Sequence, residues 1–156
     1  MTDKDQSNKD SGEERSKECL KKGLAHLHRG DPGEAVEFFS EMLIASNESP
    51  LALSCLGLSI ARTGDDMKAA ERYCKKAIDK NPNVGDFYRS LAEVYKLQGK
   101  KAEAIETLNK GLPFDRGNKK IFSEIKKFGI RKDPPISFLP RSHFLNRIIG
   151  KMLSEK

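Results

Sequence analysis

The chain has no tryptophan, few aromatic residues (7%) and no long apolar run. Its 156 residues allow one ordinary domain and exclude a large enzyme with separate cofactor and substrate domains. No apolar run exceeds four residues, whereas a membrane-spanning helix needs about 20. Because no apolar residue occurs between Met1 and Cys19, we expect no signal peptide.

Residues that commonly carry chemistry are also scarce. The chain has three cysteines, Cys19, Cys55 and Cys74, which are widely spaced and form no CxxC pair. The odd number disfavours a disulfide framework, and the spacing disfavours a zinc site. His26 and His28 are two apart on a predicted helix, so their side chains point to different faces. No Gly-rich phosphate loop, HExxH motif or nucleophile elbow occurs. We therefore expect no enzyme, no cofactor, no metal site and a reducing, cytoplasmic setting.

The formal net charge of +6 is unevenly distributed. Residues 1–18 have a net charge of −2, residues 19–115 are neutral, and residues 116–156 have a net charge of +8. The basic region either binds an anionic membrane surface or nucleic acid, or is simply a solvated surface, and the sequence leaves these open. Residues 1–15 have nothing apolar to bury beyond Met1, so we predict a disordered polar tail there.

An internal repeat organises residues 16–118. Two sets of small residues recur 34 or 35 residues apart, in the same phase: Gly23, Gly57 and Ala92, and then Ala35, Ala70 and Ala104. The repeat predicts three units, over 16–49, 50–84 and 85–118, each made of two antiparallel helices. Small residues at facing positions allow the paired helices to approach closely.

Turn signals separate the two helices of each unit. Gly30, Gly64 and Gly99 are expected to end the first helices in the left-handed conformation. Asp31 and Asp65 follow as turn or N-cap residues of the second helices.

Three stretches carry a resemblance to a known family: LGLSIARTGDDMKAAERYCKKAIDKNP, YRSLAEVYKLQGKKAEAIETLNKGLPFD and, more weakly, GLAHLHRGDPGEAVEFFSEML. They resemble the tetratricopeptide repeat, over about two thirds of the chain. The resemblance implies an all-α, right-handed α-solenoid of three helix-turn-helix repeats whose first helices line a concave groove. Members that clamp a C-terminal carboxylate use a set of Lys, Asn and Arg there, but the matching places in this chain hold Leu24, Leu58 and Glu93 rather than Asn.

The resemblance predicts a peptide-binding groove that is apolar at one end and of mixed charge at the other. Its predicted residues are Leu20, Leu24, His28, Leu51, Ser54, Cys55, Leu58, Arg62, Arg89, Glu93 and Lys96. Such a surface suits an extended peptide or an amphipathic helix of a protein partner. The alternative is a groove covered by the protein's own chain.

The remaining C-terminal residues predict a capping helix over 119–129, a Pro-rich extended arm over 130–141 and an amphipathic helix over 142–156. The predicted contact residues of the arm and final helix are Ile136, Phe138, Leu139, Phe144, Leu145, Ile148, Ile149 and Met152. They could dock on the solenoid, join two copies or another partner, or lie on a membrane surface. The ending RKDPPISFLPRSHFLNRIIGKM is similar to the endings of some bacterial tetratricopeptide proteins. The sequence therefore predicts a non-enzymatic interaction scaffold, with the basic region 116–156 as the alternative binding element.

Overall fold

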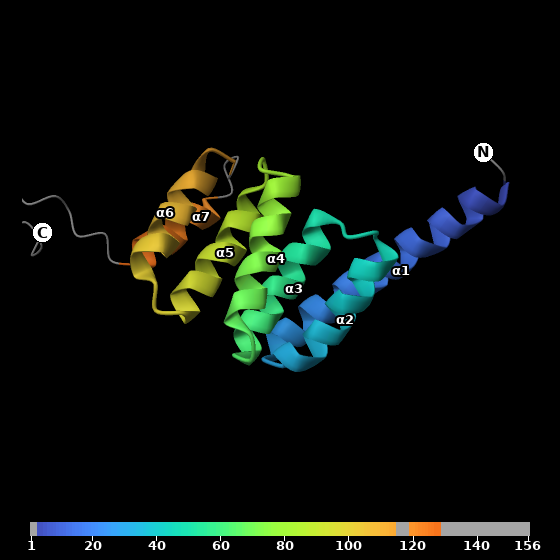
Figure 1. The fold of residues 1–156 in the computed structure, drawn as a ribbon, viewed down its shortest axis with the longest axis horizontal. Coiled ribbons are helices and arrows are strands. Elements are labelled where there is room, and N and C mark those ends of the chain that lie inside the picture. The colour runs from blue at the N-terminus through green and yellow to red at the C-terminus, as the bar shows by residue number, and fades with distance from the viewer. Residues whose placement is uncertain (1–2, 115–118, 129–156) are drawn as a thin grey trace, which may run out of the picture.

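The computed structural model describes residues 3–114 and 119–128, with side chains from residue 12 onward. Every element in these residues is a helix, and they contain no strand. In chain order the elements are α1 (Asp3–Arg29), α2 (Pro32–Ala45), α3 (Pro50–Thr63), α4 (Met67–Lys80), α5 (Gly85–Leu97), α6 (Lys101–Gly111), the 3₁₀ helix η1 (Leu112–Phe114) and α7 (Lys120–Lys127) (Figure 1). The predicted all-α class is confirmed.

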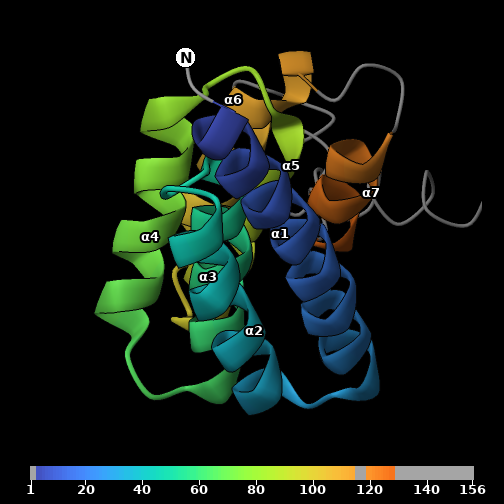
Figure 2. The same cartoon turned by 90° about the vertical axis from the view of Figure 1, so that its right-hand side faces the viewer.

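Consecutive helices pack as antiparallel pairs: α1 with α2, α3 with α4, and α5 with α6. Each pair contacts the next, through α2 and α3 and then through α5 with both α3 and α4. Figure 2, which looks along the row of helices, shows the pairs stacked behind one another. α7 packs on α6 at the end of the row. This arrangement confirms the predicted α-solenoid of three helix-turn-helix units.

A left-handed glycine follows the first helix of each pair. Gly30, Gly64 and Gly99 have φ angles of 89°, 86° and 76°, in the region that side-chain-bearing residues rarely adopt. The amide of Gly64 donates a hydrogen bond to the carbonyl of Ile60 and closes the last turn of α3. The three predicted helix ends are therefore confirmed.

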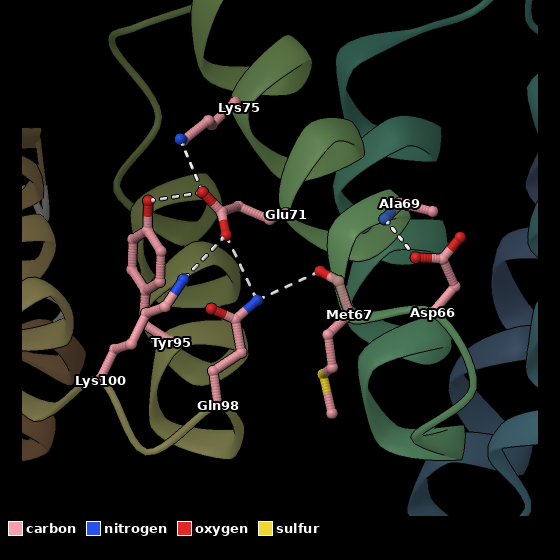
Figure 3. Close-up of polar contacts among 8 residues, drawn as sticks. All are labelled: Asp66, Met67, Ala69, Glu71, Lys75, Tyr95, Gln98 and Lys100. Carbon is pink, nitrogen blue, oxygen red and sulfur yellow. Dashed lines mark hydrogen bonds and ion pairs between the residues drawn. The ribbon is translucent and has the colours of Figure 1, made fainter.

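Asp31 and Asp65 lie in the turns before α2 and α4, as predicted, but the side chain that caps α4 belongs to a neighbouring residue. Asp66, rather than Asp65, accepts a hydrogen bond from the amide of Ala69 at 2.8 Å (Figure 3). Asp31 stands at the N-cap of α2, but its side chain makes no capping bond. The turn before α4 is one residue longer than the turn before α2, and this extra residue moves the cap to Asp66.

The small residues of the repeat lie where paired helices touch. Ala35, Ala70 and Ala104 are fully buried. A Cβ atom on Gly57 would lie 2.8 Å from the carbonyl oxygen of Ala70 and 2.7 Å from Sγ of Cys74. α3 and α4 can therefore pack this closely because position 57 has no side chain, as the repeat predicted.

The predicted disordered tail over 1–15 is corrected by the structure, in which α1 already spans most of this segment. Lys17 Nζ lies 2.8 Å from Glu13 Oε1 within the helix, and Arg15 Nε donates to Glu41 Oε1 of α2 at 2.6 Å. Charged side chains four residues apart stabilise a helix even where it has no apolar residue to bury. Figure 1 shows α1 extending past the stacked pairs.

α7 lies in the segment where a capping helix was predicted, over 119–129. Its Ile121 and Ile125 are buried in one cluster with Leu108 of α6. Residues 129–156, which hold the predicted arm, the predicted amphipathic helix and all their predicted contact residues, lie outside the described residues.

Candidate peptide-binding groove

A groove of about 590 Å³ runs along the face made by the first helix of each pair and by α7. All its lining residues lie on α1, α3, α5 or α7, or directly after α7, except Leu108 of α6. The groove is therefore built by the stacking of the repeats, because no single helix pair could form it.

α3 forms the middle of the groove because it carries apolar residues on two sides. Leu53 and Leu56 are buried in the core between the helix pairs. Residues spaced by four, three and four positions line the groove instead: Leu51, Cys55, Leu58 and Arg62. Since an α-helix repeats every 3.6 residues, these side chains form one stripe.

The structure places ten of the eleven predicted residues along this groove: Leu20, Leu24, Leu51, Ser54, Cys55, Leu58, Arg62, Arg89, Glu93 and Lys96. His28 does not line it. This side chain is exposed in the last turn of α1, one turn beyond Leu24. The role of the ten residues in binding a peptide stays a prediction.

α7 contributes a wall that the sequence analysis did not place at the groove. Lys120, Glu124, Lys127 and the following Phe128 all line it. These residues are separated by four, three and one positions, which puts them on one side of a helix, and the sequence alone shows this spacing. The missing information was the direction in which α7 docks on α6, because that direction decides which side of α7 faces the groove.

The end of the groove formed by α1 and α3 is apolar. Leu24 and Leu51 are each 41% exposed, and Leu20 and Leu58 are half-buried in the same lining. Covering apolar surface of this kind contributes about 25 cal/mol per Å². This end of the groove can therefore take the apolar side chains of a peptide.

The other end, formed mainly by α5 and α7, is charged. Its three acids are paired within their own helices: Asp86 with Arg89, Glu93 with Lys96, and Glu124 with Lys127. Arg62 and Lys120 form no ion pair with a described residue. Five cations against three acids (5 − 3) leave the groove lining with a net charge of +2.

Cys55 lies in the groove but is not activated as a nucleophile. Burial, with a smaller effect from the carboxylate of Asp86, raises the pKa of its thiol to about 11. Burial also raises the pKa of Cys74 to about 12. Both thiols are therefore protonated at neutral pH, whereas the thiolate is the reactive form. Over the residues that the structure describes, no group of three or more His, Cys, Asp and Glu side chains could hold a metal ion.

Glu71 of α4 holds the second and third helix pairs together (Figure 3). Its carboxylate accepts hydrogen bonds from Lys75 Nζ at 2.7 Å, Tyr95 Oη at 3.2 Å and Gln98 Nε2 at 3.3 Å, and Lys100 Nζ lies at 3.5 Å. Lys75 first, and then Gln98 and Lys100, lower the pKa of Glu71 to about 2, although partial burial acts in the opposite direction. The ionised carboxylate thus ties α4 to α5, which forms one wall of the groove.

Solved structures share this stack of helix pairs. The TPR2B domain of yeast Sti1, in complex with pHsp70, has a TM-score of 0.63 and 25% sequence identity, over 73% of this chain and 92% of that one. A family model described as tetratricopeptide repeat matches residues 63–123. Residues 63–123 therefore match the tetratricopeptide-repeat family, and the described residues have the fold of tetratricopeptide-repeat domains.

Two further solved structures resemble this chain. The second TPR domain of human RPAP3, in complex with the HSP70 peptide SGPTIEEVD, has a TM-score of 0.61 and 18% identity, over 75% of this chain and 97% of that one. A crystal structure of MamA has a TM-score of 0.57 and 26% identity, over 72% of this chain and 66% of that one. No curated protein matches the chain. None of the described helices is long and apolar enough to cross a membrane.

Proposed function

We propose that this chain is a non-enzymatic interaction scaffold whose groove binds a peptide or an amphipathic helix of a partner protein. The observation that carries the proposal is the pair of exposed leucines, Leu24 and Leu51, at one end of a groove whose other end is charged. A partner segment can bury apolar side chains at the first end and keep polar side chains at the second.

The structural neighbours support a protein ligand. The yeast Sti1 domain was solved as a complex with pHsp70, and the human RPAP3 domain was solved with an HSP70 peptide. A groove in the same fold therefore supports the proposal that a segment of another protein is the ligand of this chain.

The ligand is held by its apolar side chains rather than by a terminal carboxylate. Leu24, Leu58 and Glu93 stand at the places where the resemblance to carboxylate-clamping members leads us to expect Asn, and all three line the groove. Two leucines offer no hydrogen bond to a carboxylate, and a glutamate repels it. Apolar contact is the interaction that remains for the two leucines.

The scaffold acts by binding alone. Cys55, the one cysteine among the groove's described lining residues, has its thiol pKa raised to about 11 and is protonated at neutral pH. The three cysteines are free thiols, which fits a reducing, cytoplasmic setting.

The test selects peptides from a displayed random library on the full chain and measures their affinity by fluorescence anisotropy. The double variant Leu24→Asp, Leu58→Asp should bind the selected peptides at least about tenfold more weakly, because carboxylates replace the surface that covers apolar anchors. Ile44→Asp is the matched control: Ile44 is 84% exposed on α2 and does not line the groove.

Circular dichroism establishes that each variant keeps its helices. Unchanged affinity in the folded double variant would rule out the apolar end as the binding surface. An equal loss of affinity in Ile44→Asp would show that the peptides bind elsewhere or respond only to added negative charge.

A further inference from the structure

The described part of the chain ends in the groove. Phe128, its last residue, is a lining residue, as is the neighbouring Lys127 of α7. The remaining 28 residues, 129–156, follow directly from this point. Any segment within them starts its path at the edge of the groove.

Residues 142–156 form a predicted helix with an apolar stripe. The stripe consists of Phe144, Leu145, Ile148, Ile149, Met152 and Leu153. An isolated helix of 15 residues is marginal in water and gains most of its stability by packing its apolar side. The predicted helix therefore needs an apolar surface to bind.

The apolar end of the groove is such a surface. The other large apolar side chains that are exposed in the described residues do not line the groove: Ile44, Leu97, Leu112 and Phe122. We propose that the helix over 142–156 docks against Leu24 and Leu51 of its own chain and occupies the groove until a partner displaces it. This inference rests on the proposed function, because both use the same groove.

The connecting segment is long enough for this docking within one chain. Residues 129–141 are 13 residues that reach up to about 43 Å when extended, and their prolines favour extended backbone. The path from α7 across α5 and α3 to α1 takes three helix-to-helix steps of about 10 Å, or about 30 Å. A short tether of this kind gives an effective concentration in the millimolar range. A partner present at micromolar concentration must therefore bind the groove far more tightly than the helix does.

Charge decides which end of the groove the helix uses. Residues 129–156 contain six Lys and Arg against two Asp and Glu (6 − 2), a net charge of +4. The charged end of the groove is also positive on balance, so the two repel each other. Docking at the apolar end avoids that repulsion. Added salt screens the remaining repulsion and should strengthen the docked state, whereas salt weakens a contact that ion pairs hold.

The test places a photo-crosslinker on the helix of the full chain. Met152→Cys introduces a thiol in the apolar stripe, and Ser154→Cys introduces one on the opposite side of the helix. A benzophenone maleimide labels the introduced thiol selectively, because Cys19 and Cys74 are buried and Cys55 is half-buried with a raised thiol pKa. The labelled proteins are irradiated at micromolar concentration, and the cross-linked peptides are mapped by mass spectrometry.

The Met152→Cys label should react with α1 and α3, near Leu24 and Leu51, within one chain. Its yield should be several-fold higher than that of the Ser154→Cys label and should rise in 0.5 M salt. Equal yields at the two positions, or no product on α1 or α3, would overturn the inference. Products that join only two different chains would also overturn it and would identify a second copy as the occupant.

The peptide measurements separate this inference from the proposed function. Ile148→Asp disrupts the apolar stripe and should raise the affinity of the full chain for a selected peptide several-fold, because the competing helix is removed. Unchanged affinity in Ile148→Asp would overturn the docking but leave the groove as a peptide site. An intramolecular cross-link together with no peptide binding, even in Ile148→Asp, would support the docking and overturn the proposed function.

Discussion

The hydroxyl of Tyr95 on α5 donates a hydrogen bond to the carboxylate of Glu71 on α4, at 3.2 Å (Figure 3). Gln98, in the turn after α5, donates both to Glu71 and to the carbonyl of Met67, the first residue of α4. One ionised side chain therefore links α5 and the turn after it to α4, beside the apolar packing of α5 on the second helix pair.

Glu71→Gln should lower the free energy of unfolding by about 2 kcal/mol at pH 7, as measured by urea denaturation. The pKa of Glu71 lies at about 2 in the folded chain, below its ordinary value of 4.5. The contribution of the ionised carboxylate to the free energy of unfolding is complete above pH 4.5 and is lost as the pH falls through 2. The two proteins should therefore differ most at neutral pH and become equally stable near pH 2.

Glu106→Gln is the control for this prediction. Glu106 also pairs with a lysine, Lys110 at 2.7 Å, but both side chains are exposed on α6. Surface pairs contribute little to stability because water and salt screen them, so a small and weakly pH-dependent loss is expected. Equal losses of stability in Glu106→Gln and Glu71→Gln would show that the hydrogen bonds of Glu71 to α5 and the turn after it add nothing to stability.

Gly57→Ala should destabilise the protein by about 1–3 kcal/mol, although alanine is the better helix former. The new methyl group would lie 2.8 Å from the carbonyl oxygen of Ala70, a backbone atom that cannot rotate away. Gly33→Ala on α2 is the matched control, because a Cβ there meets nothing within 4 Å. It should be neutral or stabilising by up to about 1 kcal/mol. Thermal unfolding of both variants shows the sign of each change in stability. A Gly57→Ala variant as stable as the unsubstituted protein would contradict the close packing of α3 on α4.

Asp66→Ala should cost about 1 kcal/mol of stability, because it removes the side-chain cap of α4. Asp31→Ala should cost less, since Asp31 makes no capping hydrogen bond in the corresponding place before α2. Chemical denaturation of the two variants gives the comparison directly. A larger loss at Asp31 would contradict the assignment of the cap to Asp66.

Cys55 should react with iodoacetamide about 100-fold more slowly at pH 8 than an ordinary thiol, since its pKa is raised from 9.0 to about 11. The rate should keep rising about tenfold per pH unit up to pH 10, because the thiolate fraction does so below the pKa. Peptide mapping of the alkylated chain measures the rate at Cys55 alone. A plateau below pH 9 would contradict the raised pKa.

Much of the fold could be predicted because the same pattern of small residues occurs in three successive units, so each unit tests the interpretation of the others. The phase shared by Gly57 and Ala70 with their counterparts predicts which helix faces touch, whatever the remaining side chains are. The resemblance to the tetratricopeptide repeat implied that the first helices line a groove, and ten of the eleven predicted lining residues lie there. The N-cap of α4 at Asp66 was not predicted, because the turn before α4 has an extra residue. The spacing alone did not decide which of the two aspartates, Asp65 or Asp66, caps the helix.

The ends of the chain were harder to predict, because no neighbouring repeat constrains them. His28 shares a face with Leu24 by spacing, but it lies beyond the part of α1 that lines the groove. Lys120 and Phe128 lie in the groove through the way α7 docks on α6, which depends on tertiary packing rather than on local sequence.

Binding at the apolar end of the groove can be tested directly by leucine methyl NMR of the full chain during titration with a selected peptide. The largest shifts are expected for the four leucines of this end: Leu20, Leu24, Leu51 and Leu58. The methyl groups of Leu112, which is exposed but outside the groove, should not move. Saturable shifts at Leu112 with none at the four groove leucines would contradict the proposal that this groove is the binding site.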